Sequence, residues 1–183
     1  YGQVKALFAA VEPEAAGVWG DPHVGVVADT TATMGPILNI LADAWSQSDV
    51  SSSGATFSLV AFKDSPAVIG TTMKSVPMQS WLDELVASGG GDCQDAALNA
   101  LLAMAQQMPN GDQPAADILL VTDATPEGGR AQYVYTVDRL LRRGVRVTTL
   151  LNDWCPGAQI GPAAMGFLSL ATGGKAYPTD PTY

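Results

Sequence analysis

Asp29, Thr31 and Thr33 stand at alternate positions directly after a short run of valines. In an extended or gently turning loop, this spacing aims three oxygen-bearing side chains at one point. One carboxylate and two hydroxyls form a hard, all-oxygen ligand set, which suits Mg²⁺, Mn²⁺ or Ca²⁺ and does not suit Zn²⁺. The alternative is a helix N-terminus capped by Asp or Thr, but one cap needs only one such residue. The surplus of oxygens therefore favours a metal site.

Two apolar runs of the chain end in an aspartate, and both predict buried β-strands. Residues 24–28 lead into Asp29, and residues 117–122 lead into Asp123. In doubly wound sheets, sites form beyond the carboxyl ends of the strands, at the topological switch point. The pattern therefore predicts a pocket at this edge of the sheet, with both aspartates beside it.

Strands and helices alternate along the chain, which predicts an α/β fold with a doubly wound, mostly parallel sheet and helices on both faces. One early antiparallel hairpin is expected from two strand patterns separated by a turn at Lys63–Pro66. The predicted strands cover 24–28, 56–62, 67–72, 117–122, 145–151 and 175–177, and the predicted helices cover 37–45, 77–86, 97–108, 132–143 and 162–171.

Composition and charge limit the classes of function. The chain has 183 residues, of which 47% are hydrophobic, and its net charge is −9. So acidic a protein is poorly suited to binding a nucleic-acid backbone and better suited to cations or basic partners. No segment is apolar over enough residues to predict a membrane span, and none resembles a signal peptide. We expect residues 1–23 to form an N-terminal extension that packs on the domain formed by 24–183, with His23, the only histidine, as a strand-entry residue.

A glycine-rich loop, Ser88–Asp95, precedes the helix expected at 97–108. Its three consecutive glycines let the backbone approach another element closely. The loop lacks the lysine of a Walker-type phosphate loop, and Asp92 serves either as a helix N-cap or as part of a site.

Together these motifs resemble the von Willebrand factor A domain. Its metal-ion-dependent adhesion site (MIDAS) has a D-x-S-x-S motif after the first strand, a ligand from a middle loop and an Asp after the fourth strand. Asp29, Thr31 and Thr33 match the first element and Asp123 the last, while Asp92 falls in the middle loop. The G-G-G-D-C loop is most similar to the hemicentin-like branch, although Gln94–Asp95 stands where that branch often has Pro-Glu.

The resemblance implies a Rossmann-like fold and a protein-binding module that is not an enzyme. It implies a divalent cation, most often Mg²⁺, with Mn²⁺ or Ca²⁺ as alternatives, and a partner protein that presents an Asp or Glu. Thr31 and Thr33 would then be neutral ligands, and Asp29 and Asp123 would neutralise the ion directly or through water. Asp92 would add a further carboxylate. Cell adhesion or assembly is the corresponding role.

Two other functions fit parts of the sequence. Residues 29–33 also match the D-x-T-x-T loop of haloacid-dehalogenase-like phosphotransferases, in which Asp29 would be an Mg²⁺-assisted nucleophile. That chemistry also needs a lysine near the phosphate and a late acidic pair, and Ala124 rather than a second Asp follows Asp123. The third alternative is a scaffold domain whose site holds no metal.

The two cysteines, Cys93 and Cys155, are both expected at the site edge of the sheet. They form either a disulfide or two buried thiols. A bridge would tie the Asp92 loop to the loop after residue 151 and stabilise the fold by roughly 4 kcal/mol. We expect the bridge, and with it an extracellular or secreted location.

The disulfide hypothesis is tested by a thiol count. Protein that was prepared without reductant and then denatured should contain no thiol that reacts with a chromogenic disulfide reagent, because both cysteines are bridged. Reduced and denatured protein, as the control, should show both. Two reactive thiols in the unreduced sample would contradict the bridge.

Overall fold

The computed structural model describes residues 23–47, 55–72, 75–90, 94–108, 116–123, 125–152 and 161–178. The predicted N-terminal extension, apart from His23, lies outside these ranges, as do Asp92, Cys93 and Cys155. No helix within the described ranges is long and apolar enough to cross a membrane.

A six-stranded sheet forms the centre of the domain, with the strand order β3-β2-β1-β5-β7-β8. Only β2 and β3 pair antiparallel, and every other neighbouring pair is parallel. Because the chain passes from β1 to β2 on one side and later to β5 on the other, the carboxyl end of β1 lies at the switch point. The strands are β1 (His23–Asp29), β2 (Thr56–Phe62), β3 (Pro66–Thr72), β5 (Asp117–Thr122), β7 (Arg146–Leu151) and β8 (Ala176–Pro178).

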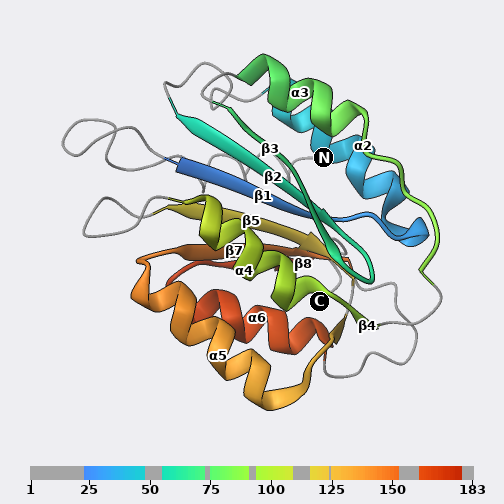
Figure 1. Cartoon of the computed structure of the whole chain (residues 1–183). Helices are drawn as coiled ribbons and strands as arrows, with labels where there is room; N and C mark the ends of the chain where they lie inside the picture. The colour runs from blue at the N-terminus through green and yellow to red at the C-terminus, as the bar shows by residue number, and fades with distance from the viewer. Residues whose placement is uncertain are drawn as a thin grey trace.

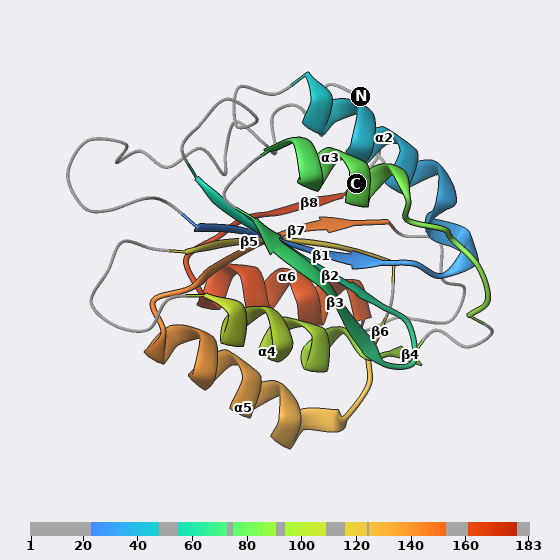
Figure 2. The same ribbon diagram turned by 45° about the horizontal axis from the view of Figure 1, so that its top comes forward.

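Helices cover both faces of the sheet (Figures 1 and 2). On one face lie α2 (Gly35–Ser46) and α3 (Ser75–Asp83). On the other lie α4 (Ala97–Gln107), α5 (Gly129–Arg142) and α6 (Gly161–Ala171). The predicted fold class, a mostly parallel α/β sheet with one antiparallel hairpin, is therefore confirmed.

Successive side chains of β1 point to opposite faces of the sheet and pack into both layers of the core. Val24 and Val26 pack with the buried side chains of α2 and α3, whereas Val27 packs with those of α4. Gly25 lies on the α4 side, where an added Cβ would come within 2.6 Å of Met104 Sδ. The missing side chain thus lets α4 lie close against β1, which places the N-terminus of α4 near the carboxyl edge of the sheet.

His23 begins β1, as expected of a strand-entry residue. It is buried, and its Nε2 lies 2.8 Å from the Ser58 hydroxyl on β2. Burial lowers the pKa of His23 below its usual 6.5, so the ring is neutral at physiological pH. Its place, at the opposite end of β1 from Asp29, gives it a structural role.

Two very short strands lie beyond the main sheet and were not predicted. β4 (Gln94–Asp95) and β6 (Thr125–Pro126) pair in parallel, with Asp95 opposite Pro126. They join the segment before α4 to the segment after β5, at the edge where the pocket was expected.

Candidate metal site at the carboxyl edge of the sheet

Asp29 and Asp123 come together as the strand pattern predicts. Asp29 is the last residue of β1, and Asp123 follows β5 directly. The two strands are neighbours with Ala28 opposite Val121, so the aspartates leave the sheet side by side. Both are buried, at 0% and 4% exposure.

Both carboxylate oxygens of Asp29 accept hydrogen bonds. Oδ1 accepts from the Thr31 amide at 2.9 Å and from the Thr31 hydroxyl at 2.8 Å. Oδ2 accepts from the Thr122 hydroxyl at 3.0 Å. These donors compensate for the burial of the charge and fix the carboxylate in one orientation.

Thr31 and Thr33 place their hydroxyls next to each other, as the alternate spacing predicts. Their Oγ1 atoms are 3.3 Å apart. Thr31 is buried and donates its proton to Asp29, which leaves its oxygen lone pairs available as a ligand. Thr33 is exposed, so the solvent side of the site opens at this residue.

The glycine-rich loop packs on this threonine turn. The Ser88 amide donates to the Thr30 carbonyl at 3.0 Å, and the Ala32 amide donates to the Gly89 carbonyl at 2.9 Å. Gly90 has a φ of 78°, and an added Cβ there would lie 2.7 Å from Thr31 Cγ2. The expected close approach of the glycine backbone is confirmed at Gly90. This contact restricts the position of the Thr31 side chain.

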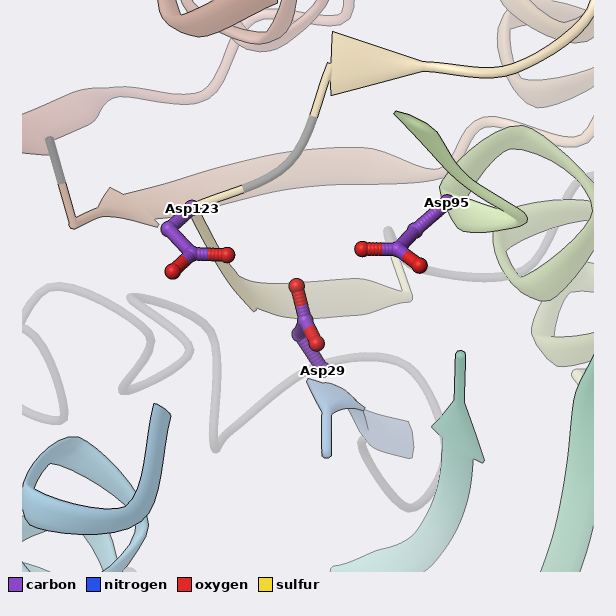
Figure 3. Close-up of side chains that lie close together, drawn as sticks. All are labelled: Asp29, Asp95 and Asp123. Atoms are coloured by element: carbon purple, nitrogen blue, oxygen red, sulfur yellow. The ribbon is translucent and has the colours of Figure 1, made fainter. Parts of the chain in front are cut away.

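A third carboxylate, Asp95, which the sequence pattern does not predict as a site residue, reaches the same point. Asp95 is 2% exposed and lies in β4, where its carbonyl accepts a hydrogen bond from the Glu127 amide at 3.0 Å. One carboxylate oxygen from each of Asp29, Asp95 and Asp123 lies within 4.8 Å of the other two. Figure 3 shows the three side chains pointing toward one another from three different segments of the chain.

In the sequence, Asp95 can be recognised only as an acidic residue two positions before the helix expected at 97–108 and three positions after Asp92. Asp92, and not Asp95, was predicted as a site residue because Asp92 directly follows the three glycines. Asp92 itself lies outside the described residues, so its place at the site stays a prediction.

The electrostatics of the triad favour a bound cation. Burial raises the pKa of Asp123, the Thr33 hydroxyl lowers it in part, and the neighbouring Asp29 raises it further. Within the described part of the chain, Asp123 Oδ2 is buried without a hydrogen-bond partner. At an effective dielectric constant of about 20, two carboxylates about 5 Å apart repel by roughly 3 kcal/mol. An all-oxygen set with an unsatisfied buried acceptor fits a hard divalent cation, which would remove this repulsion.

A family comparison agrees with this architecture. A model of the von Willebrand factor A domain matches residues 23–161, which include all strands from β1 to β7 and all three aspartates. This chain belongs to the von Willebrand factor A domain family. Proteins with this domain are usually interaction modules rather than enzymes. No curated protein sequence matches the chain at a significant level.

Solved structures with the same fold have little sequence in common with this von Willebrand factor A domain. The conserved hypothetical protein BatB of Bacteroides thetaiotaomicron superposes with a TM-score of 0.66 at 13% identity, over 87% of this chain and 90% of that one. A von Willebrand factor type A protein of Catenulispora acidiphila gives a TM-score of 0.66 at 14% identity, over 88% of this chain and 39% of that one. Proximal thread matrix protein 1 of the mussel byssus gives 0.65 at 11% identity, over 87% and 43%. These similarities establish the fold.

Replacing Asp123 by Asn should stabilise the metal-free protein. In chelator at pH 7, we expect Asp123→Asn to raise the melting temperature by about 6–12 °C, since it removes roughly 3 kcal/mol of repulsion. The same variant should lose the stabilisation that divalent cations give the parent. Because the folded pKa of Asp123 is raised, the parent loses stability as pH rises from 3.8 through that pKa, so the advantage of the variant should shrink on acidification.

Asp43→Asn is the matched control for this comparison, because Asp43 is an exposed acid on α2 away from the triad. It should change neither the melting temperature in chelator nor the response to metal. A lower melting temperature for Asp123→Asn than for the parent in chelator would contradict the repulsion argument.

Proposed function

We propose that this domain is a divalent-cation-dependent protein-binding module, of an adhesion or assembly type, which coordinates Mg²⁺ at the carboxyl edge of its sheet. The observation that carries the proposal is the convergence of Asp29, Asp95 and Asp123 on one point. Mn²⁺ and Ca²⁺ accept the same oxygen ligands, so they are alternative occupants.

The ligand set combines the predicted residues with Asp95. Thr31 and Thr33 would bind the ion through neutral hydroxyls, and Asp29, Asp95 and Asp123 would bind or neutralise it. Asp29, whose oxygens also accept from Thr31 and Thr122, sets the orientation of the threonine turn. Asp92 would add a further carboxylate.

The bound cation would supply an electrophilic position for an anionic oxygen. Thr33 is exposed, whereas the three aspartates are buried, so a ligand approaches from the threonine side. A carboxylate of a partner protein suits a hard cation there, and the acidic surface of the domain makes binding of such a group depend on the metal. The partner would therefore present an Asp or Glu.

The hydrogen bonds of Asp29 favour a binding role over phosphotransfer. An aspartyl nucleophile needs an accessible oxygen, but Asp29 is fully buried and both its oxygens accept hydrogen bonds. Its place therefore supports the non-enzymatic proposal over the haloacid-dehalogenase alternative.

The hemicentin-like relationship and an extracellular or secreted location are further parts of the proposal. The first rests on the G-G-G-D-C loop, and the second on the Cys93–Cys155 pair. Both features include residues outside the described ranges.

A pair of capped peptides that differ in one residue tests the function. A peptide with a single glutamate should shift the amide resonances of Thr31, Thr33 and their neighbours when Mg²⁺ is present and leave them unchanged in chelator. Its glutamine counterpart should have no effect, because only the carboxylate competes for the cation. Asp29→Ala should abolish the response while the sheet resonances persist, since strand-end loops add little to the core.

The matched control is Asp83→Ala, which removes an exposed carboxylate from α3. It should respond as the parent does. Equal shifts with the glutamate and glutamine peptides, or shifts that survive chelation, would refute the metal-dependent function.

A further inference from the structure

A second surface of the domain has the properties of a binding site, and it lies between α5 and α6. Both helices lie on the same face of the sheet (Figure 1). A cavity of about 490 Å³ opens between them, and its walls include Pro126, Arg130, Tyr133, Ala163 and Phe167. The Tyr133 hydroxyl donates to the Ala164 carbonyl at 2.8 Å, which joins the two helices at the floor of the cavity.

Large exposed apolar side chains lie on the same flanks of α5 and α6 as residues that line the cavity. On α5, Val134 and Leu141 are 56% and 51% exposed. They follow Arg130 by four and eleven residues, so they share its flank of the helix. The opposite flank of α5 faces α4, because Gln132 bonds to Asn99.

On α6, Phe167 and Leu170 are 67% and 66% exposed. Leu170 follows Ala163 by seven residues and Phe167 by three, which puts all three on one flank. We call the cavity and these two apolar flanks the α5–α6 groove. It holds four of the seven large hydrophobic side chains that are exposed in the described part of the chain, which makes it a candidate interaction surface.

The charge of α5 indicates which partner the groove accepts. Arg130, Arg139 and Arg142 on α5, with Arg143 directly after it, are four of the nine Lys and Arg residues of a chain whose net charge is −9. Arg142 pairs with Asp138, the only acidic residue of α5. Arg130 is exposed at the cavity, and no ion pair to it occurs among the described residues. Arg143 donates to the Ala105 carbonyl of α4, so Arg130 is the arginine that a partner meets at the cavity. An acidic segment is therefore attracted to this rim of the groove and repelled by most of the remaining surface of an acidic chain.

We propose that the α5–α6 groove binds an acidic amphipathic helix of a partner protein, independently of the metal site. The apolar face of that helix would lie along the groove, with one large side chain in the cavity and a carboxylate at Arg130. Val134 and Leu141 are seven residues apart, or about 10 Å along α5, which is the span of apolar anchors at positions i and i+7 of a docked helix. This second contact lies beyond the function proposed for the carboxylate triad.

The groove and the triad adjoin each other through the short strands. Pro126 of β6 forms part of the cavity wall and is paired with Asp95 of β4. One partner can therefore contact both sites, and two linked contacts bind more tightly than either alone.

Titration with designed peptides in chelator tests the proposal. A capped helical peptide of about 15 residues, with leucines on one face and glutamates elsewhere, should shift the amide resonances of α5 and α6. A lysine counterpart with the same leucines should bind about tenfold more weakly, because it meets Arg130 with like charge. The affinity of the glutamate peptide should be the same in Mg²⁺ as in chelator.

Two groove variants and one matched control complete the experiment. Ala163→Trp fills the cavity from an exposed position, and Arg130→Glu reverses the charge at its rim. Each substitution should weaken the binding of the glutamate peptide about tenfold. Arg139→Glu makes the same charge change on the same helix away from the cavity and should have little effect. Circular dichroism of each variant checks that the fold is intact.

Four results would overturn the proposal. They are the absence of shifts at α5 and α6 with the glutamate peptide, equal binding of the glutamate and lysine peptides, and equal losses for Arg130→Glu and Arg139→Glu. The fourth is binding of the glutamate peptide only in Mg²⁺. That result would show that the peptide binds at the metal site, which would support the proposed function and exclude the groove as a binding site for the peptide.

Discussion

The mutual repulsion of three buried carboxylates constrains the structure of the carboxyl edge of this domain. Asp29, Asp95 and Asp123 place oxygens within 4.8 Å of one another in a region from which water is largely excluded. Such an arrangement costs stability in the apoprotein, and the rest of the fold must hold it against that cost. The domain does so by rigid placement: two of the aspartates leave neighbouring strands, and the third is fixed by the β4–β6 pairing. Donors surround Asp29, while Asp123 retains a buried oxygen that accepts no hydrogen bond from the described residues.

The topology explains why these segments converge. In a sheet whose neighbouring strands are parallel, all carboxyl ends meet at one edge, and the switch point beside β1 leaves room between the loops. The threonine turn after β1 and the glycine-rich loop fill part of that room and bond to each other. Because β6 contributes both to the β4 pairing and to the cavity between α5 and α6, this edge continues into the α5–α6 groove.

The long elements could be predicted because each repeats its apolar pattern over several residues. β2 was expected at 56–62 and lies at Thr56–Phe62. α6 was expected at 162–171 and lies at Gly161–Ala171. α5 begins three residues earlier than expected, because Gly128 and Gly129, both with positive φ, carry no helical signal. That Asp29 and Asp123 lie at the same edge of the sheet could be predicted because each directly follows a strand pattern of a mostly parallel sheet.

Asp95 could not be predicted in the same way. Its strand has two residues, too few for any periodicity, and its partner strand β6 is equally short. The side chain is brought to the site by a backbone pairing between segments about thirty residues apart, and the sequence near Asp95 does not indicate that pairing. The family pattern pointed to Asp92 instead, and Asp95 was taken as a departure from it. The α5–α6 groove was missed for a related reason: the helical pattern predicts which residues of α5 and α6 are apolar, but not that one flank of each stays exposed.

Paramagnetic broadening by Mn²⁺ tests the central claim, that the three aspartates form one cation site. Substoichiometric Mn²⁺ added to the chelator-treated, isotope-labelled protein should broaden the amide resonances of Thr31, Asp95 and Asp123 together, and excess Mg²⁺ should restore them. The resonances at the opposite end of β1, near His23, should stay sharp. Broadening centred on exposed acids such as Asp43 and Asp83, or broadening at Asp29 and Asp123 that spares Asp95, would contradict the account.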